Sequence, residues 1–124
     1  MLNQVNLIGR LGADPEVRTM TGGSKVANLR IATDAYSGGK KYTEWHRVEA
    51  FGDKLVELIE ARLAKGDLVA VSNASIRTKK FTRDGVDHYT TSIVAGQNAQ
   101  VRFLQTKSQD AEERQADEAP QPGA

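Results

Sequence analysis

Only one stretch of this 124-residue chain has the spacing of a helix, and this limits the fold more than any other feature. Between Asp53 and Lys65 the apolar residues recur every three or four positions, at Leu55, Val56, Leu58, Ile59 and Leu63. Asp53 is placed to cap the first turn, and Gly66 follows as a stop signal. Up to Leu104 the remaining chain has the alternation of strands, separated by turn residues.

The strand patterns lie on both sides of this helix. We expect extended segments at Asn3–Leu11, Glu16–Met20, Lys25–Asp34, Tyr42–Phe51, Leu68–Phe81, Tyr89–Ala95 and Asn98–Leu104. Hairpin turns are expected at Thr21–Ser24 and Arg83–Gly85, and a flexible basic loop at Ser37–Lys41. This order predicts an all-β fold: a five-stranded Greek-key barrel of the oligonucleotide-binding (OB) type, with one helix between the third and fourth strands.

The end of the chain differs in composition from the rest. Ser108–Ala124 has five acidic residues and one basic residue, a net charge of −4, and no aromatic or aliphatic side chain larger than alanine. Such a segment cannot bury a core, so we expect a disordered acidic tail over 108–124 and one OB domain over 1–107. Because the whole chain carries +1, subtracting the tail leaves +5 on this domain. A basic domain is typical of a polyanion binder, although ordinary solvated surfaces often carry such an excess.

Composition also excludes several classes of protein. Cysteine is absent, which excludes disulfides and thiolate metal sites and fits a reducing cytoplasm. The first residues lack the pattern of a secretory signal, and no apolar run approaches the ~20 residues that cross a bilayer. We therefore expect a soluble, cytoplasmic protein that does not contact membranes.

The segment Tyr42–Phe51 places an unusual mixture of side chains on one face. Side chains two apart in a strand share a face, so Trp45, Arg47 and Phe51 point the same way. An unpaired guanidinium is costly to bury, which argues against a core face. Flat rings beside a cation suit a ligand with flat bases and a negative backbone, the chemistry of single-stranded nucleic acid. Glu49 shares this face, and its negative charge argues against binding of a negative backbone there.

A second basic and aromatic cluster lies between residues 77 and 83. Arg77, Lys79 and Phe81 share one side of a strand, so phosphate could be neutralised there while a base stacks. A charged edge strand that resists aggregation would have the same pattern.

Simpler explanations exist for several of these residues. By pattern alone, Trp45, Phe51 and Phe81 fit a hydrophobic core about as well as they fit stacking positions. Lys40 and Lys41 lie in the expected basic loop, which would close over a nucleic acid, but ordinary solvated lysines are the simpler interpretation.

The sequence contains no catalytic motif. His46 and His88 are the only histidines, and neither has a partner at metal-ligand spacing. The glycine pairs near Lys25 and Lys40 lack the other residues of a phosphate-binding P-loop, and no serine lies in a Gly-x-Ser-x-Gly elbow. We therefore expect a protein that is not an enzyme and has no metal or cofactor.

A series of motifs resembles the bacterial-type single-stranded-DNA-binding protein (SSB) family. The resemblance covers roughly Asn3 to Leu104, and its motifs are Val5–Gly12, Asp14–Arg18, Thr43–Val48, Phe51–Gly52, Lys65–Gly66, Arg77–Phe81 and Tyr89–Thr91. It implies an OB barrel that assembles as a homotetramer and wraps single-stranded DNA without sequence preference.

The resemblance also implies roles for individual residues. Trp45 and Phe51 match stacking positions, Phe81 stands where many members have tryptophan, and Tyr36 lies near a further aromatic position. His46 matches a position at a subunit contact. The residues that match contacts to the DNA backbone are Arg47, Arg77, Lys79 and Lys80, and further candidates for phosphate contact are Arg18, Lys40 and Lys41.

Three features depart from the family pattern. Val71–Ile76 is one residue longer than the corresponding strand, which predicts a β-bulge or altered pairing. Glu49 stands at a usually apolar position, where it would weaken DNA contact or pair with Arg47. The tail lacks the acidic tip, closing in proline-phenylalanine, by which family members recruit replication and repair enzymes, and this puts such recruitment in question.

Together these features predict a non-catalytic protein of the nucleoid that protects and organises single-stranded DNA in replication, recombination and repair. One alternative is a diverged OB module that binds RNA or serves as a replication accessory, and competition between poly-dT and RNA would distinguish it. Another is a barrel whose aromatic face meets a polypeptide, in which case binding would depend little on salt.

Overall fold

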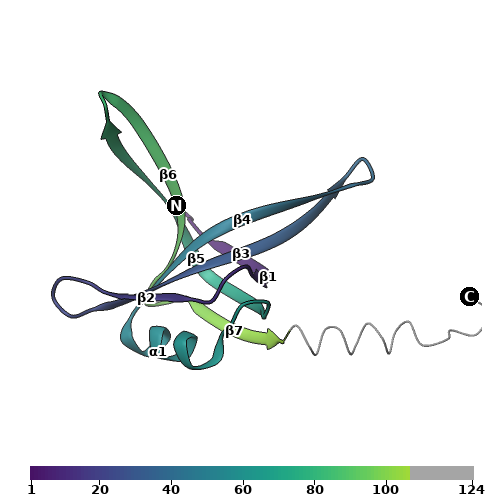
Figure 1. Cartoon of the computed structure of the whole chain (residues 1–124), viewed down its shortest axis with the longest axis horizontal. Coiled ribbons are helices and arrows are strands. Elements are labelled where there is room, and N and C mark those ends of the chain that lie inside the picture. The colour runs from purple at the N-terminus through teal and green to yellow at the C-terminus, as the bar shows by residue number, and fades with distance from the viewer. Residues whose placement is uncertain (107–124) are drawn as a thin grey trace, which may run out of the picture.

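The computed structural model describes residues 1–106 and builds them from seven strands and one helix (Figure 1). The elements are β1 (Val5–Leu11), β2 (Glu16–Thr19), β3 (Lys25–Ser37), β4 (Lys40–Phe51), α1 (Asp53–Arg62), β5 (Leu68–Arg83), β6 (Val86–Ala95) and β7 (Gln100–Gln105). The predicted all-β class with one helix is confirmed. The tail expected over 108–124, and the domain boundary before it, lie outside the described residues.

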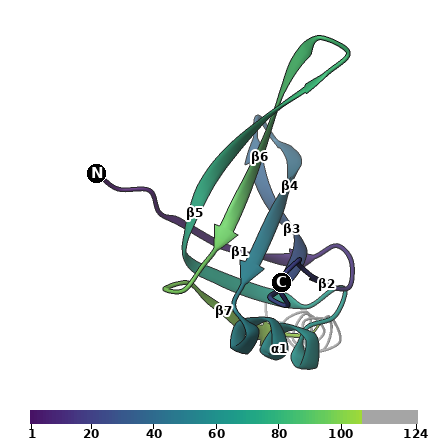
Figure 2. The same cartoon turned by 90° about the vertical axis from the view of Figure 1, so that its left-hand side faces the viewer.

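Five of the strands close into a barrel. They are hydrogen-bonded in the order β1-β3-β4-β6-β5, and β1 pairs again with β5. The pairing of β4 with β6 is parallel and the others are antiparallel. β2 pairs with β3, and β7 pairs with the first half of β5. In Figure 2, α1 lies across one end of the barrel. In the sequence it falls between β4 and β5, the third and fourth barrel strands, as the OB prediction requires.

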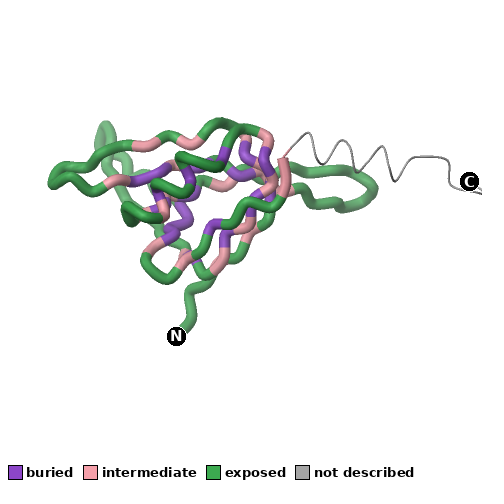
Figure 3. Tube along the Cα trace, turned by 90° about the horizontal axis from the view of Figure 1, so that it is seen from below, coloured by how far each residue is buried: buried purple, intermediate pink, exposed green. Residues whose placement is uncertain are grey.

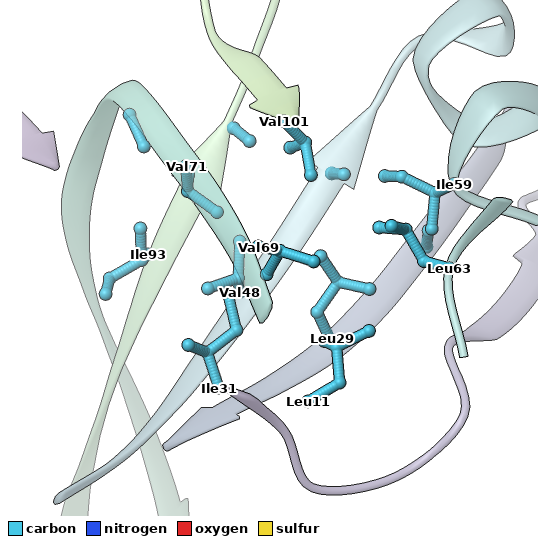
Figure 4. Packing of buried hydrophobic residues seen from close by; sticks show 14 of the residues in the cluster. Leu11, Leu29, Ile31, Val48, Ile59, Leu63, Val69, Val71, Ile93 and Val101 are labelled. Atoms are coloured by element: carbon cyan, nitrogen blue, oxygen red, sulfur yellow. The ribbon is translucent and has the colours of Figure 1, made fainter. Parts of the chain in front are cut away.

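The barrel encloses one hydrophobic core (Figure 4). Alternate residues of β3 and β4 face inward, so Leu29, Ile31 and Val48 are fully buried. The helix closes the end of the barrel by burying Val56 and Ile59. Each fully buried side chain of this size stabilises the fold by about 1.5–3 kcal/mol relative to an exposed one. This core holds the backbone of β3 and β4 in place behind their outer face.

Two long hairpins extend from the barrel in different directions (Figure 1). β3 and β4 pair as far as Ser37 and Lys40, joined by Gly38 and Gly39, whose φ angles are 58° and 79°. Two glycines with positive φ form a tight turn whose twist matches the strands, so the predicted flexible loop is wrong and Lys40 lies in a strand. β5 and β6 turn at Asp84-Gly85, as predicted. The outer parts of both hairpins are exposed (Figure 3).

The helix is shorter at its C-terminal end than its spacing predicts. It ends at Arg62, because the chain then makes a turn in which Asp67 Oδ2 accepts the Ala64 N–H at 2.9 Å. Its N-cap is Gly52, not Asp53, and no side chain of residues 1–106 makes a capping hydrogen bond there. No helix within residues 1–106 is long and apolar enough to span a membrane.

A bulge interrupts β5 where the sequence predicts one. Residues 5–7 of β1 pair with residues 71–74 of β5, so β5 has one extra residue there. Asn73 adopts a φ of 59°, and its N–H donates to Asn6 Oδ1 at 3.0 Å. Its side-chain nitrogen donates to the carbonyl of Asn98 at 3.1 Å. Asparagine tolerates this left-handed conformation better than most residues, so the local sequence suits the bulge.

Candidate nucleic-acid interface

The outer face of β4 carries the first group of candidate residues. Trp45 is 62% exposed and Arg47 is also exposed, whereas Val48 on the opposite face is fully buried. Phe51 is half-buried on the outer face and does not belong to the core cluster. The core interpretation is therefore wrong for these aromatic rings. The predicted alternation along β4 is confirmed, and it leaves the indole open to a ligand.

The indole of Trp45 packs against Gly12, which directly follows β1. A β-carbon on Gly12 would lie 2.9 Å from Cη2 and 3.3 Å from Cε3 of the ring, closer than normal packing allows. Glycine therefore provides the space that the ring occupies. The result is a tryptophan that is supported by backbone and still mostly exposed, as a stacking surface for bases requires.

Strand pairing brings a second arginine to this face. Arg30 of β3 is the direct cross-strand partner of Arg47. Within residues 1–106, neither guanidinium has a hydrogen bond or an ion pair. The loop expected at residues 37–41 conceals this pair, because a flexible loop leaves the register of the two strands open. A two-residue turn at Gly38-Gly39 would have revealed the pair, since counting outward from that turn sets Arg30 opposite Arg47.

Two open hollows meet at these two arginines. One, of about 500 Å³, extends to Trp45, Thr90 and Thr91, and the other, of about 430 Å³, extends to Arg18 on β2. Arg30 and Arg47 line both. The hollows therefore form a continuous exposed surface from the indole, past the two guanidinium groups, to the β2–β3 hairpin.

Glu49 forms an ion pair with Lys79 and not with Arg47, the partner considered from the sequence. Its Oε2 lies 3.9 Å from Lys79 Nζ on β5, and no ion pair forms with Arg47. The Lys79 side chain is 57% exposed, and an ion pair of this kind contributes only ~0–1 kcal/mol. A phosphate could therefore replace the carboxylate as the partner of Lys79 at little cost.

The β5–β6 hairpin holds the second aromatic group. Phe81 is 44% exposed and stacks on His88, with ring centroids 5.1 Å apart and an interplanar angle of 18°. Arg83 Cζ lies 6.0 Å from the centroid of the Phe81 ring. Arg77 and Lys79 share this face of the strand and are exposed. The hairpin therefore carries a ring beside several cations, as predicted.

Three predicted residues point away from this outer face. Lys80 alternates to the other side of its hairpin, where its Nζ lies 3.3 Å from Asp87 Oδ2. Lys40 lies on the side of β4 opposite Trp45. His46 is on that same side, half-buried, with Nε2 2.8 Å from the hydroxyl of Thr33.

The comparison with known proteins agrees with this geometry. The model of the single-strand binding protein family matches residues 2–104. The chain belongs to this family. It is also similar to the solved structure of the Plasmodium falciparum SSB complex with ssDNA, at 33% sequence identity and a TM-score of 0.79. That match covers 84% of this chain and 96% of the other.

In this SSB-family chain the β3–β4 hairpin continues the outer face beyond the tryptophan. Tyr36, 75% exposed, is the cross-strand partner of Lys41, on the same face as Trp45. The Lys41 ammonium lies 3.5 Å from Asp34 Oδ2. Tyr36 thus adds a third open ring to the face, next to a cation that is already paired.

The two hairpins separate as they leave the barrel, as Figure 1 shows. Because Trp45 lies on β4 and Phe81 on β5, the two rings belong to different hairpins and not to one flat surface.

Within residues 1–106, no group of three or more His, Cys, Asp or Glu side chains is placed to hold a metal ion. The arrangement is suited to contact with a long, flexible anion.

Proposed function

We propose that this chain binds single-stranded DNA along the outer face of its two hairpins, without sequence preference and without catalysis. Membership of the SSB family and the similarity to an SSB complex with ssDNA support this ligand. The observation that carries the proposal is an indole, 62% exposed, on the same strand face as an arginine that, among residues 1–106, forms no ion pair. Core aromatic residues would be buried, and a protein contact would not need these cations.

The proposed mechanism uses two kinds of contact that ignore base identity. Bases would stack on Trp45, Phe51, Phe81 and Tyr36, and each stacked base contributes about 1–3 kcal/mol. Phosphates would meet Arg47, Arg77, Lys79, Arg18 and Lys41. Because every base has a flat face and every nucleotide a phosphate, affinity would depend on strand length and salt more than on sequence. Lys40 and Lys80 would contact DNA only where the strand passes round a hairpin.

Binding of this kind acts by occupancy. A strand held by its bases and phosphates cannot pair again with its complement and is shielded from nucleases. We propose that the chain protects and organises single-stranded DNA in this way during replication, recombination and repair, in the cytoplasm and at the nucleoid.

Assembly as a homotetramer is the second part of the proposal. Exposed apolar side chains lie on β1, β5 and β6, at Ile8, Ile76 and Tyr89, and a subunit contact would cover them. His46, half-buried beside Thr33, would lie near such a contact. Native mass spectrometry of the full chain tests this, because a tetramer predicts four times the mass of one chain and a monomer would reject it.

A fluorescence titration with poly-dT at low and high salt tests the DNA-binding proposal. Trp45 is the only tryptophan, so its emission reports directly on the proposed site. We expect quenching on addition of poly-dT and an affinity that falls steeply as salt rises. Absence of binding at low salt would reject the function, and poly-U that competes as well as poly-dT would favour an RNA-binding module.

A further inference from the structure

The pairing of Arg30 with Arg47 is unfavourable in the free protein. Cross-strand partners in an antiparallel sheet have β-carbons about 4.5–5.5 Å apart, and like charges directly opposite each other destabilise the pair. A surface strand has no structural need for two facing arginines. Their presence on an exposed face therefore points to an anion that binds between them.

The acidic side chains of the same face do not neutralise these arginines. Glu49 pairs with Lys79 at 3.9 Å, and Asp34 pairs with Lys41 at 3.5 Å. Asp14 Oδ1 accepts the backbone N–H of Lys65 at 2.8 Å. Each of these three carboxylates thus has another partner. Glu16, which lines the same hollow as both arginines, forms no ion pair with either of them among residues 1–106. Within the described part of the chain, both guanidinium groups therefore keep their donors available.

The backbone behind the two arginines is held firmly. Leu29 and Ile31, on either side of Arg30, are fully buried in the core, and so is Val48 next to Arg47. The carbonyl of Arg30 also accepts the N–H of Gly12 at 2.9 Å. A site built on such strands holds its side chains in position before the ligand arrives, which lowers the entropy lost on binding.

We propose that Arg30 and Arg47 together bind one phosphate group of the strand whose base stacks on Trp45. This inference rests on the proposed DNA-binding function and adds Arg30, which no sequence motif assigns. The planar guanidinium offers paired donors that match phosphate oxygens, and two of them can hold one phosphate from both sides. Trp45 lies two residues from Arg47 on the same face, about 7 Å along the strand. The two groups are therefore close enough to share one nucleotide or its neighbour.

The test compares poly-dT binding by the full-length wild type with R30Q, R47Q and the double variant R30Q/R47Q over a range of salt concentrations. R62Q is the matched control, because it removes one exposed arginine from α1, at the end of the barrel away from the hairpins. R30K keeps the positive charge but loses the planar guanidinium with its paired N–H donors. Thermal unfolding of each free variant shows whether it is folded, and R30Q should be no less stable than the wild type because it removes a like-charge contact.

We expect R30Q to weaken binding about tenfold at low salt, because a charge-assisted hydrogen bond is lost. For single strands, each phosphate contact contributes about 0.7 to the slope of log affinity against log salt. One shared phosphate predicts that the double variant loses about 0.7 from this slope, whereas two separate phosphates predict about 1.4. R30K should retain the wild-type slope with reduced affinity, and R62Q should match the wild type.

Three results would overturn the inference. R30Q could bind poly-dT as tightly as the wild type, the double variant could lose the slope of two phosphates, or R62Q could weaken binding as much as R30Q does. A wild-type chain that does not bind poly-dT at low salt would instead reject the proposed function, and the inference with it.

Discussion

The indole of Trp45 occupies the space that a side chain on Gly12 would need. The three atoms nearest to a β-carbon on Gly12 all belong to that ring. Gly12 also donates its N–H to the carbonyl of Arg30 at 2.9 Å, so one glycine touches both the aromatic and the cationic parts of the site. The end of β1 thus contributes to the interface without presenting a side chain to the ligand.

Replacing Gly12 with alanine should move the indole and weaken DNA binding. The new methyl group would collide with the ring, and Trp45 would have to leave its support. The φ of Gly12 is not in the left-handed region, so the fold should persist. Tryptophan emission and a poly-dT titration measure both effects. Gly96→Ala is the control, because a β-carbon there meets nothing within 4 Å; unchanged emission in Gly12→Ala would contradict this view of the site.

Replacing Trp45 with alanine should weaken poly-dT binding by about 1–3 kcal/mol, because one stacked base is lost. The salt dependence should change little, since no charge is removed. Fluorescence anisotropy of labelled oligo(dT) measures the affinity, because it does not depend on tryptophan emission, which the variant lacks. Tyr42→Ala is the matched control, because Tyr42 is an exposed ring on the other face of β4. Equal losses of affinity in both variants would show that a ring on the outer face contributes no more to DNA binding than a ring on the opposite face.

Replacing Glu49 with glutamine should strengthen DNA binding. The change removes a carboxylate that repels phosphate and competes with it for Lys79. Because Lys79 meets a phosphate in both proteins, the number of phosphate contacts and the salt slope should stay about the same while the affinity rises. Titration at several salt concentrations measures this. Glu44→Gln removes an acid from the opposite face of β4 and serves as the control; weaker binding by Glu49→Gln would show that the carboxylate has a positive role.

Replacing Gly9 with alanine should destabilise the barrel. A β-carbon there would collide with the carbonyl oxygen of Ala32 and lie 2.7 Å from Ile31 Cγ2. Because backbone must move, we expect a loss of about 1–3 kcal/mol in the free energy of unfolding. Urea denaturation at matched protein concentration measures it. A Gly9→Ala chain as stable as Gly96→Ala would mean that β1 and β3 do not approach so closely.

The bulge in β5 should tolerate glycine at position 73 but not a β-branched residue. Asn73 has a φ of 59°, which costs other L-residues roughly 1–2 kcal/mol and glycine little. Asn73→Val should therefore be less stable in urea than Asn73→Gly by about that amount. Equal stability of the two variants would indicate that this residue is not in the left-handed conformation.

Most of the fold could be predicted from local patterns. The alternation of Leu29 and Ile31 with Arg30 marks a strand with one buried face, and the barrel bears this out. The errors lie at junctions. The Gly38-Gly39 turn resembles a flexible loop in sequence because glycine pairs occur in both, and only the pairing of the flanking strands distinguishes them. The helix ended early because of a turn made by Asp67, which no helix signal contains.

The candidate site, like the fold, could be predicted only in part from local sequence patterns. Alternation along β4 placed Trp45 and Arg47 together, and this needed no structure, because the period of two is a property of the extended backbone itself. Whether the rings lie in the core or at the surface could not be decided so, since both faces of the strand carry apolar groups. The closed barrel settled it by enclosing Val48.

By itself, therefore, the sequence determined which side chains share a face of a strand. Only the tertiary structure decided which faces meet: Arg30 beside Arg47, Glu49 beside Lys79, and the indole over Gly12. The physical reason is that side-chain direction follows from neighbouring peptide units, whereas contacts between strands depend on register and barrel closure. Barrel closure is set by packing of the whole core, and the register of a hairpin by its turn type, which the glycine pair at positions 38 and 39 does not reveal by itself.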